Sequence, residues 1–158
     1  MDEPGFFGGK LGTVLRYQDS GSVDAAFVEV SGSHNFYSNI MAINVNPNVS
    51  IIPAINSYVY KRGAVTGGGY GYSYSNLNTV YFLIGPNSYK VLTNLAEVAN
   101  MNSAEGDSGG LMYVLTDNGI KYSVVGVVVG GGKHETTGYH HTYATKHSFL
   151  PWGITIIS

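Results

Sequence analysis

Residues 106–110, with the sequence Gly-Asp-Ser-Gly-Gly, constrain this chain more than any other stretch. Glycines on both sides of Ser108 let the backbone adopt conformations that a Cβ atom would penalise, so the segment is expected to form a tight turn. In such a turn the N–H groups of Gly106 and Ser108 can converge on one point and stabilise an oxyanion. The turn therefore predicts Ser108 as a candidate nucleophile, with its anion-binding site formed by Gly106 and Ser108.

The rest of the sequence is typical of an all-β protein. Among its 158 residues are 22 glycines and 13 tyrosines, and only 11% of the residues are charged. Tyrosine, valine, isoleucine and threonine favour strands, whereas glycine and asparagine favour turns. Residues 116–119, Thr-Asp-Asn-Gly, are expected to close a hairpin, and residues 147–152 can form one helical turn. Strands are expected at residues 10–17, 24–30, 58–61, 70–74, 80–84, 89–95, 111–115, 122–129 and 142–145.

Charge and composition exclude several classes of partner. The formal net charge is −2, with no basic patch, so neither nucleic acid nor an anionic membrane is expected to bind. No apolar run reaches the length of a transmembrane helix, and no signal peptide is visible. The absence of cysteine excludes a thiol nucleophile, a zinc–thiolate site and a disulfide to a partner chain.

The sequence predicts neither a metal site nor a cofactor. A metal site formed by His134, His140, His141 and His147 is disfavoured, because adjacent residues of a strand point to opposite faces. Residues 130–133, Gly-Gly-Gly-Lys, lack both the upstream glycine and the following serine or threonine of a phosphate-binding loop.

Several motifs occur in one order along the chain, at residues 19–30, 60–67, 104–113, 124–131, 142–145 and 149–156. Together they resemble the chymotrypsin-like (trypsin-fold) serine proteases, in particular the streptogrisin-like branch, over most of the chain. The resemblance implies an all-β fold, a trypsin-like antiparallel Greek-key β-barrel. It further implies that residues 1–30 are remnant strands of an N-terminal barrel, residues 31–56 an inter-barrel connection and residues 57–158 the C-terminal barrel.

In this family a catalytic triad activates the serine. The resemblance implies Ser108 as the nucleophile and Asp24 as the carboxylate that orients the histidine, because apolar residues 25–28 follow Asp24 directly. The alternative for Asp19 or Asp24 is that it only closes a turn. The family's histidine precedes the aspartate, but none of the residues before Asp24 is histidine. We therefore expect the histidine to come from an upstream segment or from a partner chain that carries the N-terminal fragment.

That departure leaves three explanations open. The chain is one product of a cleaved precursor, an incomplete sequence, or a pseudoprotease that has lost the chemistry.

Asp107, next to the nucleophile, is expected to have a structural role. A carboxylate buried by the fold needs a cation, because an unpaired buried charge is costly. The resemblance implies a basic residue from the strand at residues 60–67, so an ion pair from Asp107 to Lys61 or Arg62 is predicted.

Substrate selection is expected to depend on Asn102, Val129, Gly130, Gly131 and His141. Asn102 offers no charge at the pocket base to recruit lysine or arginine. Val129, Gly130 and Gly131 can pair with an extended peptide as an added strand. Either His140 or His141 can line the pocket; the alternative is that both are exposed loop residues.

These observations predict a serine endopeptidase, or its serine-bearing fragment, that acts on a peptide or protein substrate. The resemblance implies a secreted or cell-surface location. The alternative is a non-catalytic pseudoprotease that serves as a peptide-binding or structural module.

Overall fold

A computed structural model describes residues 12–30, 39–40, 43–116 and 120–150 of the chain. Residues 10–11, 117–119 and 151–156, for which the sequence predicts part of a strand, a hairpin turn and a closing segment, lie outside the described residues. The elements are strands β1 (Gly12–Ser20), β2 (Val23–Val30), β3 (Asn39–Ile40), β4 (Ile43–Ser50), β5 (Tyr58–Gly63), β6 (Gly67–Ser75), β7 (Thr79–Gly85), β8 (Ser88–Thr93), β9 (Ala96–Ala99), β10 (Leu111–Thr116), β11 (Lys121–Lys133) and β12 (His140–Lys146), with a 3₁₀ turn η2 (His147–Phe149). No helix in these ranges is long and apolar enough to traverse a lipid bilayer.

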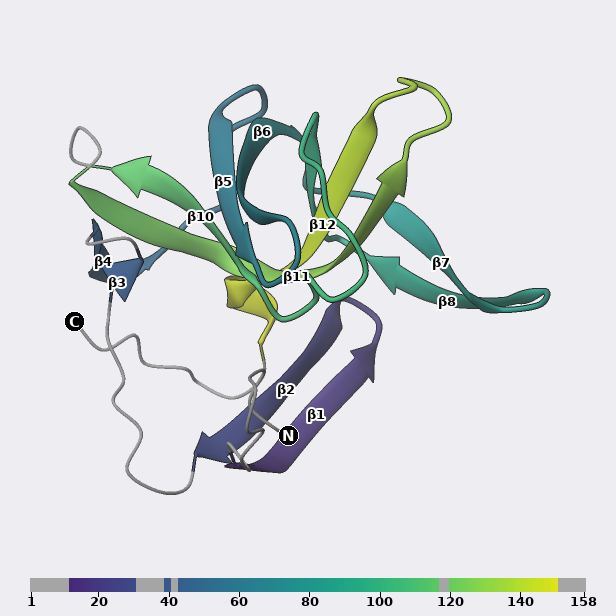
Figure 1. Ribbon diagram of the computed structural model, residues 1–158, viewed down its shortest axis with the longest axis horizontal. Coiled ribbons are helices and arrows are strands. Elements are labelled where there is room, and N and C mark those ends of the chain that lie inside the picture. The colour runs from purple at the N-terminus through teal and green to yellow at the C-terminus, as the bar shows by residue number, and fades with distance from the viewer. Residues whose placement is uncertain (1–11, 31–38, 41–42, 117–119, 151–158) are drawn as a thin grey trace.

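Six antiparallel strands close into a barrel (Figure 1). Their order is β10-β5-β6-β9-β12-β11, and β11 pairs again with β10 to complete the ring. In this order β9 lies beside β12, although β10 follows β9 in the sequence. The chain therefore crosses the barrel between β9 and β10, which is a Greek-key connection. The predicted all-β, trypsin-like barrel is thus confirmed.

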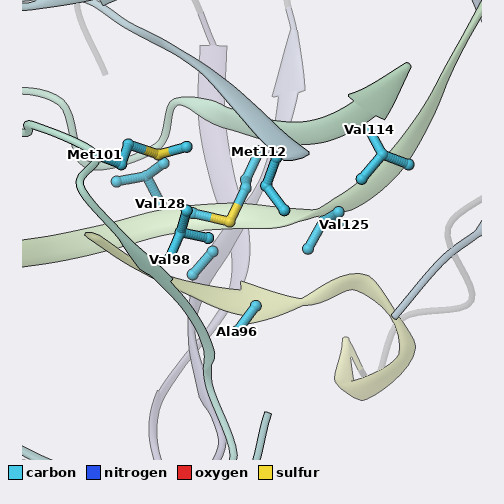
Figure 2. Close-up of a cluster of buried hydrophobic side chains, with 9 residues drawn as sticks. Ala96, Val98, Met101, Met112, Val114, Val125 and Val128 are labelled. Carbon is cyan, nitrogen blue, oxygen red and sulfur yellow. The ribbon is translucent and has the colours of Figure 1, made fainter. Parts of the chain in front are cut away.

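The barrel interior is filled by small and medium apolar side chains. Alternate residues of a strand point to the same face, so one face of a barrel strand is turned to the interior. The apolar side chains of this interior come from β5, β9, β10, β11 and β12 and from Met101. Figure 2 shows these side chains converging between the barrel strands. Each fully buried aliphatic side chain stabilises the fold by about 1.5–3 kcal/mol. The cluster consists of Val59, Ala96, Val98, Met101, Met112, Val114, Val125, Val128 and Ala144.

Tyrosines cover part of the outer face of the barrel. Tyr58 lies opposite Tyr72 and Tyr60 opposite Tyr70 in the β5–β6 ladder. The ring centroids of these two pairs are 4.9 and 6.2 Å apart. Such cross-strand aromatic pairs stabilise a sheet by about 0.2–1 kcal/mol each. The high tyrosine content therefore stabilises strand pairing outside the barrel core.

Two hairpins lie outside the ring. Among the described strands, β7 pairs only with β8, and β1 only with β2. Figure 1 shows the β1–β2 hairpin lying across one end of the barrel, with β7–β8 extending from its side. The β1–β2 hairpin is joined to the barrel where the Asp24 amide donates to Thr145 Oγ1 at 2.9 Å. Within the predicted connection, residues 43–50 form β4, which pairs in parallel with β11; the three-part division of the chain stays a prediction.

Candidate active site

Ser108 is exposed in the turn between β9 and β10. Two backbone hydrogen bonds hold this turn against β11: Gly109 N donates to Val128 O at 2.9 Å, and Val128 N donates to Gly110 O at 2.8 Å. Gly106 has a φ of 94°, which side-chain-bearing residues rarely adopt. Glycine at 106 is therefore required by the backbone path that presents Ser108.

The amide groups of this turn differ in whether they have an acceptor. Asp107 N donates to Ala104 O at 3.0 Å, and Gly110 N donates to Asp107 O at 3.0 Å. Within the described part of the chain, the N–H groups of Gly106 and Ser108 have no acceptor. Both amides named for the oxyanion hole are thus available to an added ligand, while that assignment itself stays a prediction.

A cleft of about 770 Å³ lies between the barrel and the β1–β2 hairpin, and Ser108 and Asp24 both line it. Ser108 Oγ donates a hydrogen bond to Val129 O at 3.2 Å. Among the described residues that line this cleft there is no histidine. The structure therefore brings the predicted serine and aspartate to one cleft, in which none of the described lining residues supplies an imidazole.

Asp24 is held by a lysine that the sequence reasoning did not identify. Its Oδ2 lies 2.8 Å from Lys90 Nζ, and Lys90 also forms an ion pair with Asp19. Burial lowers the pKa of Lys90, but the hydrogen bonds to Asp19 and Asp24 outweigh it, so the pKa is raised. Lys90 lies on β8, far from both aspartates in sequence, and no local pattern marks it as their partner.

Asp107 is 1% exposed and forms the best-connected polar group of the site. Of the two bases predicted to pair with it, Lys61 is the one in contact, with Nζ 3.0 Å from Oδ2. The Thr66 hydroxyl also donates to Oδ2, at 2.5 Å. Amides of Val65 and Thr66 donate to Oδ1 at 2.9 and 3.0 Å, and the Ala104 amide donates to Oδ2 at 3.2 Å.

These contacts determine the protonation of Asp107. Burial disfavours its charged form, but hydrogen bonds from the hydroxyl and amide of Thr66, from Lys61 and from the Val65 amide outweigh burial and hold its pKa well below the usual value. The carboxylate thus stays ionised and fixes residues 104–107 against the β5–β6 turn. Thr66 was missed from the sequence, although its place in that turn, shortly after Lys61, is consistent with the role.

Acid should remove this contribution to stability. The unfolded chain has the ordinary aspartate pKa of about 3.9, so between that value and the lower folded-state pKa it binds more protons than the folded chain. The stabilisation by Asp107 is therefore fully present above pH about 4 and is lost as the pH falls through the folded-state value. Urea denaturation at a series of pH values should show a steeper acid loss for the wild type than for Asp107→Asn. Equal slopes would contradict this role.

The residues predicted to select the substrate do not line one common pocket. Asn102 is exposed and lines a separate pocket of about 590 Å³, together with residues of β6. Gly131 lies against Ser103 and His140. A Cβ atom added at Gly131 would overlap Ser103 Oγ and would lie 3.0 Å from His140 Cε1. Gly130 lies under the ring of Phe82.

His141 is fully buried and turned away from Gly131. Its Nδ1 lies 2.8 Å from Glu97 Oε1, and its Nε2 lies 2.9 Å from Thr137 Oγ1. Of the two adjacent histidines, His140 is the one whose ring lies beside Gly131, with its Nδ1 3.0 Å from Met101 O.

Comparison with known proteins gives structural but not sequence relatives. No family model and no curated protein matches the sequence. A chymotrypsin from Cellulomonas bogoriensis superimposes with a TM-score of 0.66 at 19% identity, over 90% of this chain and 72% of that chain. Protease A of Thermobifida fusca gives 0.62 at 24% identity, over 85% and 67%. A Nocardiopsis protease gives 0.63 at 21% identity, over 85% and 66%. This chain therefore has the fold of the bacterial chymotrypsin-like serine proteases.

Proposed function

We propose that the chain is a serine endopeptidase, or the serine-bearing part of one, that is completed by a histidine from an upstream segment or a partner chain. The observation that carries the proposal is the exposed Ser108 in a cleft shared with Asp24, beside two amides for which the described residues offer no acceptor. The fold shared with solved proteases supports it. A secreted or cell-surface location belongs to the same proposal, with no nucleic acid or membrane among the partners.

The proposed reaction is acyl transfer. A histidine entering the cleft would take the proton of Ser108 Oγ, which then attacks the carbonyl carbon of a peptide. The oxyanion formed would accept hydrogen bonds from the N–H groups of Gly106 and Ser108. Its collapse would break the peptide C–N bond, the histidine would pass the proton to the leaving amine, and water would then hydrolyse the acyl-enzyme. Asp24 would orient the histidine. To do so, the Asp24 carboxylate would have to give up part of its contact with Lys90.

The peptide is proposed to bind along β11. Pairing of β10 with β11 ends at Val127, whereas β12 still pairs with Gly130 and Gly131 on the other edge. The edge at residues 129–131 can therefore accept an added strand next to Ser108. Asn102 offers a polar but uncharged group nearby, which fits the expected lack of selection for lysine or arginine.

One observation favours the second candidate, a non-catalytic peptide-binding or structural module. Ser108 Oγ donates to Val129 O, and within the described residues the cleft offers it no imidazole. A serine in this state is a poor nucleophile.

Free imidazole should activate Ser108 by acting as the histidine side chain that none of the described cleft residues supplies. The purified chain is incubated with a fluorophosphonate probe with and without imidazole, and labelling is located by mass spectrometry of peptides. General-base catalysis by a positioned side chain contributes about 10²–10⁴-fold. Free imidazole is not held in place, so labelling of Ser108 should rise by a smaller factor, about tenfold.

Two variants control this experiment. Ser108→Ala should abolish the labelling, whereas Ser88→Ala, which changes an exposed serine in the β7–β8 hairpin, should leave it unchanged. No labelling of Ser108 in either condition would favour the non-catalytic module.

A further inference from the structure

A carboxylate and two imidazole rings meet on the outer face of the barrel. Glu97 of β9 is 4% exposed and stands opposite Tyr143 of β12. His141 lies two residues before Tyr143 and so shares its face. His134 directly follows β11, at the start of the turn to β12. Glu97, His134 and His141, here called the Glu97 cluster, do not line the cleft that holds Ser108.

The three side chains direct one atom each to a common point. Glu97 Oε1 lies 2.8 Å from His141 Nδ1 and 3.7 Å from His134 Nε2. All three atoms lie within 4.8 Å of one another. In a tetrahedral zinc site with bonds of about 2.0–2.1 Å, neighbouring ligand atoms are about 3.3 Å apart. The distance from Glu97 Oε1 to His141 Nδ1, 2.8 Å, is shorter than this value, and the distance to His134 Nε2, 3.7 Å, is longer.

Residue Thr137 fixes which nitrogen of each ring faces Glu97. Its amide donates to His134 Nδ1 at 3.3 Å, which leaves Nε2 directed at the carboxylate. Its hydroxyl lies 2.9 Å from His141 Nε2, which leaves Nδ1 directed at the same oxygen. Histidines that bind metals typically donate the N–H of the nitrogen that does not bind. His141 meets this condition, because the Thr137 hydroxyl can accept from its Nε2. His134 Nδ1 instead accepts from the Thr137 amide, so zinc binding through Nε2 requires the ring proton to move to Nδ1 and this hydrogen bond to be released.

The other neighbours of the carboxylate are uncharged. The Tyr143 hydroxyl donates to Oε1 at 3.3 Å, and Asn78 Nδ2 donates to Oε2 at 3.1 Å. A buried carboxylate is costly unless a cation and further hydrogen bonds compensate it. The hydrogen bonds are present, and a bound divalent cation would supply the charge.

We propose that the Glu97 cluster binds one Zn²⁺ ion, which ties the turn at residues 134–139 to β9. Two imidazoles and a carboxylate are ligands that zinc accepts, and a water molecule would complete the four positions. The His134 side chain is 26% exposed, which gives the ion a path of entry.

Binding also requires the relative orientation of the two rings to change. The rings of His134 and His141 are stacked, with centroids 4.4 Å apart and an interplanar angle of 16°. An ion lies close to the plane of each imidazole that binds it. The angle between the two nearly parallel ring planes must therefore increase before both rings can bind one ion. His134, at the edge of the cluster and at the start of a turn, is the ring able to move.

Zinc titration of the metal-free chain tests the proposal. Isothermal titration calorimetry should show one Zn²⁺ per chain, and the zinc should raise the melting temperature. His134→Gln should weaken zinc binding by about 100-fold or more, since even a residue that only orients a ligand is worth 10–100-fold in metal affinity. His140→Gln removes the neighbouring histidine that faces Gly131, so it should bind zinc as the wild type does.

No stoichiometric zinc binding, or a loss of less than about tenfold in His134→Gln, would overturn the proposal. Proton NMR of the wild-type histidine rings provides a readout that needs no variant. Zinc should shift the ring signals of His134 and His141 and leave those of His140 in place, and the reverse pattern would refute the site.

Discussion

Replacing Lys61 by methionine should destabilise the chain by about 3–5 kcal/mol, because it leaves the Asp107 carboxylate buried without its cation. Both side chains are almost completely buried, and Nζ lies 3.0 Å from Oδ2. Methionine fills a similar volume, so the loss of stability comes from the unpaired buried charge rather than from a cavity. Urea denaturation followed by far-UV circular dichroism measures the free energy of unfolding, and the result gives the strength of the contact that positions the Ser108 turn.

Two further variants separate this charge effect from other consequences of losing a lysine. Lys133→Met removes an exposed lysine at the end of β11 and should change stability by no more than about 0.5 kcal/mol. The double variant Lys61→Met/Asp107→Asn should regain a large part of the loss, because the buried charge is gone. If Lys61→Met were as stable as Lys133→Met, the pair would have no structural role.

Much of the barrel was predictable because its motifs are local. The turn at residues 106–110 and the alternating strands on either side of it carry their own signals. β9 was missed, since Ala96–Ala99 is short, contains residues of low β-propensity, and is a strand only through its pairing with β6 and β12. Conversely, residues 80–84 and 89–95 have the pattern of barrel strands, but β7 and β8 pair with each other outside the ring.

The site residues, like the strands, were predictable only where the local sequence carries a signal. Sequence alone left Lys61 and Arg62 as alternatives, because the tyrosines on both sides of Val59 do not reveal which face of β5 is buried. The structure shows Val59 and Lys61 buried on one face and Arg62 exposed. The Glu97 cluster could not be inferred without β9, since Glu97 and His141 are 44 residues apart in sequence. The histidines alone therefore do not predict a metal site.

Alanine at Gly126 should cost more than about 3 kcal/mol, above the usual range for overpacking. Gly126 lies on β11 opposite Lys146 of β12. An added Cβ would overlap the carbonyl oxygen of Thr145, and it would lie 2.8 Å from the Thr145 carbonyl carbon and 3.1 Å from Lys146 Cα. All three are backbone atoms, so no side-chain rotation relieves the overlap. In a closed ring, separation of β11 from β12 also disturbs the neighbouring pairs.

The matched control lies on the same strand. At Gly132 an added Cβ would meet no atom within 4 Å, so Gly132→Ala should leave the free energy of unfolding unchanged or raise it by about 0.4–1 kcal/mol. Urea denaturation of the two variants compares the same chemical change at two sites of one strand. Equal stabilities would show that β11 and β12 do not approach as closely at Gly126 as the barrel requires. A large difference would show that the close approach of β12 to β11 at Gly126 requires a residue without a Cβ atom.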